Sequence, residues 1–441
     1  MVMVRSPGNI AASGDGGGLR VAAWLDSRTL PFELAELPSE TVLVGGAVRD
    51  ALLGRSGAGP LDLDFVLPIA AVETARTLAQ RHGAGFVLLD RDRAIARVVF
   101  ANGDTADFAQ QMGADLTADL RRRDYTLNAI AWSPRDRQVI DPLGGLAAIA
   151  QGQLSMVHPD NLRDDPLRLL RAYRQCAQLG FAIAPDTRPW LQKLAPHLAT
   201  VAGERVQAEL NALLAAPNGD RWIRQAWQDG QFQTWLPDLT GPTLDHLEAL
   251  GQVGDDLGDR WPAFAEVFYG PDRAHRWGPW AIMARRALAV GPDPIPAQRT
   301  LETLKYSRAE SRIAIALLDS RRAIAPLHTG QPLTPRQHYD LFQIIKDAFP
   351  AAIGLWLAIG IDPDRLIPTL DRWHRPNDPI AHPVPLLGGK ALMDQLDLPP
   401  GPTVGALLYA IAIAQAEGKI QTPDHAIEFA RTWLLETNQS P

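Results

Sequence analysis

Cysteine is almost absent from this sequence, whose 441 residues contain a single one, Cys176. One thiol excludes a disulfide framework and a metal cluster held by several thiolates, which indicates a reducing, cytoplasmic environment. Long hydrophobic stretches are absent too, because no apolar run reaches the roughly 18–20 residues of a membrane span. Residues 1–20 also lack the apolar segment of a signal peptide. We therefore predict a globular, cytoplasmic protein without a membrane partner.

An excess of positive charge is also missing. The 43 Lys and Arg residues are outnumbered by 50 Asp and Glu residues, which leaves a net charge of −7. Taken alone, this balance argues mildly against a nucleic-acid partner, because neutralising phosphates requires clustered Lys and Arg. The basic residues do gather locally, in a triplet at 121–123 and in a series of arginines from 163 to 174. Local charge therefore says more about partners than the total does.

The chain divides into regions of different pattern. Residues 1–30, rich in Gly, Ser and Ala, are expected to form a disordered lead-in. Short apolar segments of strand type alternate with helical ones over the next 125 or so residues, and ANGD between two of them is a hairpin turn signal. The expected strands are TVLVGG, LDLDFVLP, FVLLD, IARVVF and DTADFA. Ala-, Leu-, Arg- and Gln-rich segments separated by Pro and Gly then predict a long, all-helical region.

Two aspartates interrupt the apolar strand GPLDLDFVLP at residues 59–68. In a strand, residues i and i+2 point to the same face, so Asp62 and Asp64 would stand side by side and repel each other. A cation in front of them would remove this repulsion, and oxygen ligands on a rigid strand suit Mg²⁺, which completes its shell with waters and substrate phosphates. The alternative is a partly exposed strand with one solvated face.

Thirteen or so residues upstream, LVGGAVRD resembles a phosphate cradle. A strand that runs into Gly45 and Gly46 and then a helix lets backbone N–H groups approach an anion at the positive end of the helix. Arg49, one turn into that helix, is within reach of a phosphate oxygen. A tight turn between strand and helix, without any ligand, is the alternative.

Two arginine-rich segments complete the pattern. DLRRRDYTLNAIAW (119–132) changes abruptly from three arginines to an apolar stretch, which a merely solvated charge run does not explain. In RDDPLRLLRAYRQCAQLGF (163–181), Asp165 and Pro166 mark a helix start. Arg168, Arg171 and Arg174 then lie along one side of that helix. Like charges at this spacing are destabilising unless an anion lies against them; a solvent-facing basic helix is the alternative.

Together these segments resemble the class II tRNA nucleotidyltransferases and the bacterial poly(A) polymerases. The GGxVRDxLLG, DxD and RRDFTINA motifs of that family appear as GGAVRDALLG, DLD and RRDYTLNA. Its DPxGGxxDL, EDxxRxxR and ERxxxE motifs are matched by DPLGGLAAI, DDPLRLLR and ERVQAE. Two departures are a missing final acidic residue in DPLGGLAAI and Asp164 in place of the family's Glu.

The resemblance implies an α+β fold: a nucleotidyltransferase head with a mixed sheet (31–155), then a helical neck (156–220), a helical body (221–330) and an RNA-binding helical tail (331–441). It also implies template-independent transfer of nucleotides from CTP, and in some members ATP, to the 3′ end of tRNA. The attack would be in line at the α-phosphate, with pyrophosphate leaving.

Site residues follow from the resemblance position by position. Asp62 and Asp64 would bind the catalytic Mg²⁺. The positions that match nucleotide-binding residues are Gly45, Gly46, Arg49, Arg122, Arg123, Asp165, Arg168, Arg171 and Arg174. A third carboxylate often assists in this superfamily, and Asp107 is the candidate, with a plain surface aspartate as the alternative. Glu204, Arg205 and Glu209 are expected to be structural, Arg205 and Glu209 forming an i,i+4 contact.

The assignment of Asp165 and Arg168 to base selection has a physical argument of its own. C and A present an exocyclic amine on the pairing edge, where U and G present a carbonyl. A carboxylate accepts from the amine while an arginine donates to the neighbouring ring nitrogen. This pair would accept C or A and reject U and G without a nucleic-acid template.

One departure from the family gives evidence on how many nucleotides this protein would add. Only residues 109–121 separate Phe108 from Arg122. Family members that add all of CCA carry a longer loop there, and relatives that add only CC have it shortened. The short segment favours CC addition, with a separate enzyme adding the terminal A. The alternatives are a poly(A) polymerase that uses ATP on general RNA 3′ ends, a catalytically silent RNA-binding protein and a nucleotide sensor.

The region after residue 220 is less informative. It holds most of the tryptophans, for which core packing is the favoured interpretation over stacking on RNA. The basic pairs Arg285–Arg286 and Arg321–Arg322 are expected either to contact the tRNA backbone or to lie on a solvated helix face.

Overall fold

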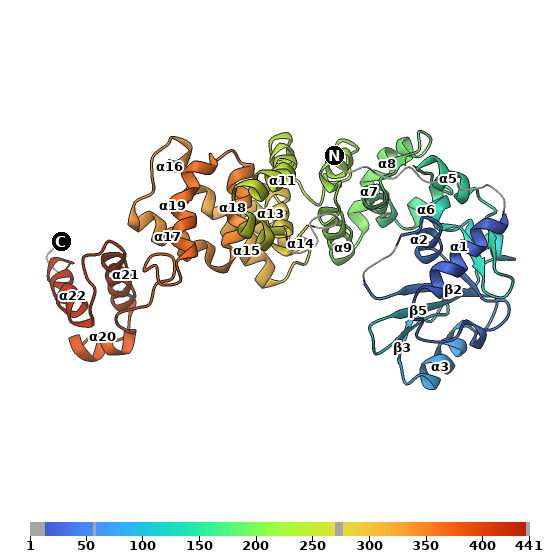
Figure 1. Ribbon diagram of the computed structural model, residues 1–441, viewed down its shortest axis with the longest axis horizontal. Helices are drawn as coiled ribbons and strands as arrows, with labels where there is room; N and C mark the ends of the chain where they lie inside the picture. The colour runs from blue at the N-terminus through green and yellow to red at the C-terminus, as the bar shows by residue number, and fades with distance from the viewer. Residues whose placement is uncertain (1–13, 56–58, 270–276, 438–441) are drawn as a thin grey trace. The chain divides into compact units, whose positions relative to one another are not determined.

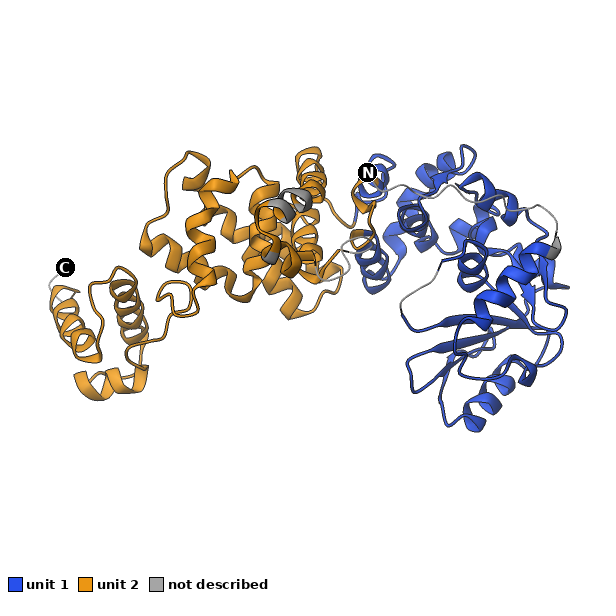
Figure 2. Ribbon diagram, viewed as in Figure 1, with its two compact units in different colours: residues 1–213, 222–234 blue, residues 214–221, 235–441 orange. Residues whose placement is uncertain are grey.

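The computed structural model describes residues 14–55, 59–269 and 277–437. The chain forms two compact units, which Figure 2 shows in different colours. The first consists of Met1–Leu213 with Trp222–Thr234, and the second of Leu214–Arg221 with Trp235–Pro441. All the strands in the described part of the chain lie in the first unit, and the second is helical (Figure 1). The expected order of a mixed α/β head and a helical remainder is confirmed.

The head is built on a mixed seven-stranded sheet with the order β3-β4-β5-β2-β1-β6-β7. The neighbours β2 and β5 are parallel, and the other pairs are antiparallel. The strands are β1 (Val42–Val44), β2 (Asp62–Leu67), β3 (Gly85–Asp90), β4 (Ile95–Val99), β5 (Thr105–Gln110), β6 (Ala131–Ser133) and β7 (Gln138–Ile140). The five expected strands are confirmed, and β6 and β7 are additional.

One face of the sheet is covered by α3 (Ala71–Arg81), which packs on β3, β4 and β5. Alternation along the strands produces this face, because every second residue of β4 and β5 points toward α3. Ala96, Val98, Ala106 and Phe108 are each fully buried there. The opposite face therefore carries the residues between them.

On that opposite face, the β1 side of the sheet is covered by the segment that contains α4 (Leu116–Leu120) and the short 3₁₀ helix η2 (Thr126–Asn128). Leu120 and Ala129 from this segment form one buried cluster with Val42, Val44 and Val66 of the sheet and with Ala131. The segment that holds the arginine triplet is thus anchored over β1 and β2, beside the two aspartates.

The predicted disordered lead-in is wrong for part of its length. Residues 14–26 form the helix α1 (Gly14–Asp26), which packs on β7 and on α2 (Gly46–Leu52), whereas residues 1–13 lie outside the described part. Val21, Ala22 and Leu25 are buried by this contact. Gly18 allows the close approach, since a Cβ there would lie 2.1 Å from the carbonyl oxygen of Arg137. Glycine suggested disorder in the sequence, but at Gly18 it is needed for α1 to pack against the backbone at Arg137.

Helices of the neck complete the first unit. They are α5 (Gly145–Gln151), α6 (Pro159–Asp164), α7 (Leu167–Leu179), α8 (Arg188–Leu194), α9 (Gly203–Leu214) and the part of α10 (Gly219–Gln228) that follows Arg221, with a two-stranded sheet of β8 (Gln153–Leu154) and β9 (Ala182–Ile183). The first residues of α10, up to Arg221, belong to the second unit. Buried Asp229 connects them, accepting hydrogen bonds from Tyr173 of α7, Arg188 and Gln192 of α8. The unit continues through residues 222–234, beyond the predicted neck boundary at 220.

The second unit begins with helices of the body. They are α11 (Gly241–Arg260), α12 (Pro262–Tyr269), α13 (Pro279–Ala289), α14 (Pro294–Thr303), α15 (Arg308–Ala323), α16 (Ala325–His328), α17 (Pro335–Ile345), α18 (Phe349–Ala358) and α19 (Pro363–His374). The stretch Pro335–Ala358 is long and apolar enough to cross a membrane by length and composition alone. However, 72% of the most apolar part of this stretch is buried, and α18 packs on α11 and α13. The stretch therefore belongs to the core of the body.

The basic pair Arg285–Arg286 is neither solvated nor available to RNA. Arg285 is fully buried, forms an ion pair with Asp220 and donates from Nε to the carbonyl oxygen of Leu214 at 2.7 Å. Arg286 is 8% exposed, and its Nη1 lies 3.0 Å from Glu310. Both expectations for this pair are wrong, because its partners come from distant parts of the chain. Core packing is confirmed for Trp222, Trp235 and Trp356, each at most 7% exposed.

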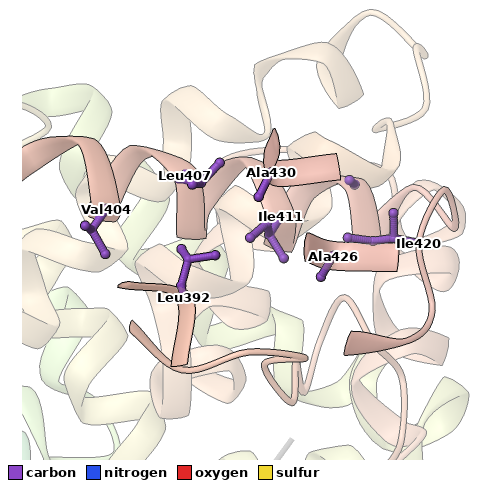
Figure 3. Packing of buried hydrophobic residues seen from close by; sticks show 8 residues of the cluster. Leu392, Val404, Leu407, Ile411, Ile420, Ala426 and Ala430 are labelled. Carbon is purple, nitrogen blue, oxygen red and sulfur yellow. The ribbon is translucent and has the colours of Figure 1, made fainter. Parts of the chain in front are cut away.

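The chain ends in three helices with a small core of their own: α20 (Gly389–Leu396), α21 (Pro402–Ala416) and α22 (Pro423–Thr437). Figure 3 shows how Leu392 of α20, Leu407 and Ile411 of α21 and Ala426 of α22 converge. Ala426 and Ala430 of α22 are both fully buried in this cluster. Tyr409 ties the tail to the body through a 2.7 Å hydrogen bond to Asp340 of α17.

Candidate active site

Three carboxylates lie together on the face of the sheet opposite α3. Asp62 and Asp64 share this face of β2, and Asp107 is the direct neighbour of Asp64 on the parallel strand β5. Arg97 stands opposite Asp107 on the next strand, β4. The register thus aligns Asp64, Asp107 and Arg97 in one row across the sheet. The expectation that the two aspartates of β2 share a face is confirmed, and the row adds a cation that the sequence motifs did not indicate.

The electrostatics of this row favour a bound cation. Burial raises the pKa of Asp64 to about 6; Arg123 opposes the rise, and the charges of Asp62 and Asp107 add to it. A carboxylate held among like charges is poorly stabilised, and a divalent cation in front of it would reverse this balance. In the described part of the chain, no group of three or more His, Cys, Asp or Glu side chains is arranged as a metal site. Two carboxylates, with waters and substrate phosphates as the other ligands, are nevertheless what Mg²⁺ commonly uses.

Asp107 differs from its neighbours because both its oxygens are engaged. Arg97 donates from Nε to Oδ1 at 2.7 Å and from Nη2 to Oδ2 at 2.8 Å. This hydrogen bonding raises the pKa of Arg97. Sequence reasoning missed Arg97, and the ANGD signal alone does not locate it. A two-residue Asn-Gly turn would place Val98 opposite Asp107, whereas the observed loop of three residues, closed by the Phe100–Asp104 pair, places Arg97 there. Asp62 is held more lightly, by a 2.5 Å hydrogen bond from the hydroxyl of Thr105.

The glycine turn lies beside these carboxylates. Gly45 has φ 75° and ψ −136°, a conformation that strongly favours glycine. A Cβ there would lie 3.0 Å from Oδ2 of Asp64 and 3.4 Å from Nη1 of Arg123, so the turn, the aspartate and the arginine are in contact. At Gly46 the corresponding position lies 3.5 Å from Nη2 of Arg49. The two glycines and two arginines expected to contact a nucleotide are therefore assembled next to the carboxylates.

The position of Arg49 is set by the buried amide of Asn128. Arg49 donates from Nη1 to Oδ1 of Asn128 at 2.8 Å and from Nε to Asp50 at 2.9 Å. The amide nitrogen of Asn128 in turn donates to Asp124 at 2.9 Å. Asn128 and Asp124 both belong to the RRDYTLNA motif, and the sequence analysis assigned neither of them to the site. The abrupt change from charged to apolar residues in that motif reflects this buried polar network.

The arginine triplet is held by backbone contacts from the neck. Asn161 of α6 donates to the carbonyl oxygens of Arg121 and Arg123, both at 2.8 Å. Arg168 of α7 donates from Nη1 to the carbonyl oxygens of Arg122 at 2.9 Å and of Asn161 at 3.0 Å. Nε of Arg123 is buried and has no hydrogen-bond partner in the described structure. The side chains of Arg122 and Arg123 are thereby left to face the pocket described below.

Asp165 lies in the break between α6 and α7. It caps the end of α6, and Pro166 precedes the first residue of α7. Arg205 of α9 donates from Nη2 to Oδ2 of Asp165 at 3.0 Å, and Nε of Arg168 lies 3.9 Å from the same oxygen. Asp165 and Arg168 are thus adjacent, as base selection requires, and Arg205 orients the carboxylate.

The three arginines of α7 have different surroundings. Arg171 is bound to Asp124 at 3.0 Å and approaches Glu209 at 3.5 Å, while Arg174 donates to Glu209 at 2.5 Å. Burial alone would raise the pKa of Asp124, but Arg171 and two hydrogen bonds hold it below the usual value. In place of the expected contact between Arg205 and Glu209, Glu209 pairs with Arg171 and Arg174 of α7, and Arg205 pairs with Asp165 in the break between α6 and α7. Arg174 has a structural contact here, and its nucleotide-binding role stays a prediction.

A pocket of about 820 Å³ lies beside the carboxylate row, and Asp62, Asp64 and Asp107 are not among the residues that line it. Val66, Ala109 and Ile95 form an apolar part of its lining and occupy neighbouring positions on β2, β5 and β4, one step along from the carboxylate row. Most of the charged lining comes from the segment of the arginine triplet and from the neck, and Arg93 comes from the turn between β3 and β4. The other charged residues of the lining are Asp119, Arg122, Arg123, Asp124, Asp164, Asp165, Arg168, Arg171 and Arg205. This volume is in the range of small-molecule sites. An apolar floor with fixed charges at one end suits a nucleotide.

Comparison with known proteins identifies this arrangement. Residues 41–155 match the family "Poly A polymerase head domain", residues 180–241 match "Probable RNA and SrmB- binding site of polymerase A", and residues 280–430 match a domain 2 of tRNA nucleotidyltransferases. A Synechocystis protein named CC-adding tRNA nucleotidyltransferase is 43% identical over 91% of this chain and 95% of its own. The chain belongs to the tRNA nucleotidyltransferase family. The expected membership is confirmed, and the protein is an enzyme of the nucleotidyltransferase class.

Other relatives of this nucleotidyltransferase differ in their named products. A Geobacter sulfurreducens CC-adding enzyme is 33% identical over 94% of this chain and 99% of its own. A Deinococcus radiodurans A-adding enzyme is 34% identical over 92% and 98%. Among solved structures, the Thermotoga maritima CCA-adding enzyme in complex with tRNA has 22% identity and a TM-score of 0.66, covering 94% of this chain and 98% of its own. That likeness confirms the fold.

Proposed function

We propose that this enzyme adds two C residues to the 3′ end of tRNA from CTP and releases pyrophosphate. The observation that carries the proposal is the position of the Asp62–Asp64 pair directly beside a pocket whose lining contains Asp165 and Arg168. A reacting centre and a base-selecting pair are thereby combined in one site. The 43% identity to a CC-adding enzyme over nearly the whole chain supports the same substrate.

Asp62 and Asp64 are the residues that would hold Mg²⁺ in this site, as the raised pKa of Asp64 among like charges supports. When bound, such an ion lowers the pKa of the RNA 3′-hydroxyl and neutralises charge at the phosphates. The rest of the binding is done by the chain. The backbone N–H groups at Gly45 and Gly46 and the guanidinium groups of Arg49 and Arg123 surround the place for the triphosphate, at the start of α2. Asp107, held by Arg97, contributes charge near the reacting atoms.

Selection of the base rests on Asp165 and Arg168. Asp165 accepts from an exocyclic amine, which C and A have and U and G lack at that position. Arg168 cannot turn away, because its Nη1 is bound to two backbone carbonyl oxygens. Arg205 similarly restrains Asp165. A rigid pair of this kind discriminates because a wrong base would leave its buried polar atoms unpaired.

Stopping after CC is supported by the short connection between the head strand and the arginine triplet. β5 ends at Gln110 and α4 begins at Leu116, so only residues 111–115 lie between them. A segment this short, anchored by the hydrogen bond from the amide of Met112 to Asp119 at 2.9 Å, has little freedom to rearrange for a second base. A separate A-adding enzyme would then complete the CCA end. The poly(A) polymerase alternative is not favoured, because the 43% and 33% relatives are named CC-adding.

The helical tail predicted for residues 331–441, which begins with α17 and ends with α22, is proposed to contribute to binding the tRNA. A cytoplasmic location is part of the proposal as well, and the single, buried cysteine, Cys176, supports it. Both statements are independent of the number of nucleotides added.

The proposal is tested with three tRNA transcripts, ending before CCA, after C and after CC, each incubated with CTP alone or ATP alone. We expect two nucleotides from CTP on the first transcript, one on the second, and no addition from ATP on the third. Addition of a single A to the third transcript would refute CC specificity and leave a CCA- or A-adding enzyme. Long A tails on unrelated RNA would establish the polymerase alternative.

Base selection is tested separately with Asp165→Ala. We expect incorporation from UTP to rise relative to CTP, because the acceptor that distinguishes an amine from a carbonyl is lost. Asp160→Ala is the matched control: Asp160 lies on α6, is exposed and pairs with Arg163. Unchanged selectivity in Asp165→Ala would refute the role of Asp165.

A further inference from the structure

Two exposed valines lie on the same sheet face as the catalytic carboxylates. We call Val87 of β3 and Val99 of β4 the valine strip. Val87 pairs with Arg97 and therefore continues the row Asp64–Asp107–Arg97, whereas Val99 pairs with Thr105, the neighbour of Asp62. They are 47% and 37% exposed, while the alternate residues of β4, Ala96 and Val98, are fully buried toward α3. The strip is thus an open extension of the site.

The position of this strip at the sheet edge calls for an explanation. β3 is the last strand on its side of the sheet, and exposed edges of natural sheets usually carry charged residues, because apolar ones promote association. Here Val87 lies two strands and Val99 one strand from the strand of Asp107, and both side chains are open to solvent. Open apolar surface beside a functional site is typical of a binding surface.

The in-line geometry of the proposed reaction indicates which part of the substrate reaches the valine strip. Under the proposed function, the departing pyrophosphate lies at Gly45 and Gly46, on the β1 side of Asp64. An in-line displacement places the attacking hydroxyl on the opposite side of the α-phosphate, which here is the side of β5 and β4. The β1 side of this face is already covered by Leu120 and Ala129. The RNA end must therefore approach across β5, β4 and β3.

We propose that the valine strip seats the 3′-terminal nucleotide of the RNA and thereby positions its hydroxyl. This inference rests on the proposed function and adds a substrate subsite to it. The unpaired end of an RNA has exposed base and ribose faces, which bind to open sheet surfaces in other RNA-binding folds. Valine contacts these faces without reading the identity of the base, as an enzyme must when its RNA end changes with each addition.

Kinetics of Val87→Asp and Val99→Asp test the subsite. Each variant replaces an apolar contact with a charge that repels RNA phosphates. We expect the KM for tRNA to rise about tenfold, while the KM for CTP stays within about twofold of wild type. The matched control is Leu88→Asp, since Leu88 is also exposed on β3 but pairs with Ala96 and so belongs to the α3 face. An unchanged KM for tRNA in both valine variants, or an equal rise in Leu88→Asp, would overturn the proposal.

A second measurement needs neither turnover nor a destabilising charge. Because the only native thiol, Cys176, is buried, a cysteine introduced at Val87 or Val99 is the one exposed thiol in the described structure. We expect Val87→Cys or Val99→Cys to form a disulfide with a tRNA transcript that ends before CCA and carries a tethered thiol on its last base. Leu88→Cys should not. Equal crosslinking of all three, or none, overturns the subsite. A lack of C addition by the wild-type enzyme would instead refute the proposed function.

Discussion

Replacing Gly45 with alanine tests how tightly the active site is built around the glycine turn. Gly45 has φ 75° and ψ −136°, and its Cα faces the carboxylate of Asp64. The added methyl group would lie 3.0 Å from Oδ2 of Asp64 and 3.4 Å from Nη1 of Arg123. The distance to Asp64 is shorter than an ordinary contact and the distance to Arg123 is at its lower limit, so the turn or the carboxylate of Asp64 must move.

The expected effect of Gly45→Ala on stability and activity has two sources. The backbone conformation costs a residue with a Cβ about 1–3 kcal/mol. Displacing Asp64 by a few tenths of an ångström adds little to unfolding but disturbs the reacting geometry, where a shift of about 1 Å can reduce the rate about a hundredfold. We therefore expect Gly45→Ala to lower the free energy of unfolding by about 2 kcal/mol and kcat by about tenfold.

A matched control separates strain from crowding. Gly54, after α2, also has a positive φ, 64°, but a Cβ there would meet nothing within 4 Å. Gly54→Ala should lose about 1 kcal/mol of stability and retain wild-type kcat. Urea unfolding and single-turnover C addition measure the two quantities. If Gly45→Ala kept wild-type kcat, or if Gly54→Ala lost as much activity, the contact between the turn and Asp64 would not matter for catalysis.

Three further predictions concern the charged residues of the site. Asp64→Asn should abolish C addition while leaving CTP binding, measured by equilibrium dialysis, within about threefold, since the pocket residues are intact; retained activity would refute its role. Arg97→Gln should lower the Mg²⁺ concentration for half-maximal activity about threefold, because a positive charge beside the carboxylates is lost; a higher requirement would contradict this. Asp124→Asn should reduce stability at pH 7 by about 2–3 kcal/mol, because Arg171 keeps only Glu209 as a partner. Since the pKa of Asp124 is lowered in the folded state, its stabilisation is present above the unfolded pKa and is lost on acidification through the folded pKa. The difference between variant and wild type in unfolding free energy should therefore shrink in acid, and a constant difference would refute the pairing.

The sequence alone predicted much of the site because several of its features are local. Strand alternation is enough to place Asp62 and Asp64 on one face, and a strand followed by Gly45 and Gly46 is enough to predict the turn into α2. The order of motifs along the chain identified the family, which the comparisons confirmed. These inferences depend on neighbours within a few residues, where backbone geometry leaves few options.

Other features depend on which distant segments meet. Arg97 was overlooked until the register of β4 and β5 placed it against Asp107. Glu209 was assigned to a contact within its own helix, yet it pairs with Arg171 and Arg174 of α7. Nothing in the local pattern around Arg285 shows that it is buried beside Asp220.

The N-terminal segment is another feature that the local sequence pattern did not determine. Its glycines suggested disorder, but Gly18 allows α1 to pack against the backbone at Arg137, more than a hundred residues away. A periodic pattern states which face of a helix or strand is apolar, and a motif states which groups can react. Only the tertiary structure decides the partner of each charge and the cover of each face, because burial and pairing energies depend on atoms brought together from distant parts of the chain. In this enzyme, the shared face of Asp62 and Asp64 was determined locally, and the neighbours of these carboxylates on β5 and β4 were not.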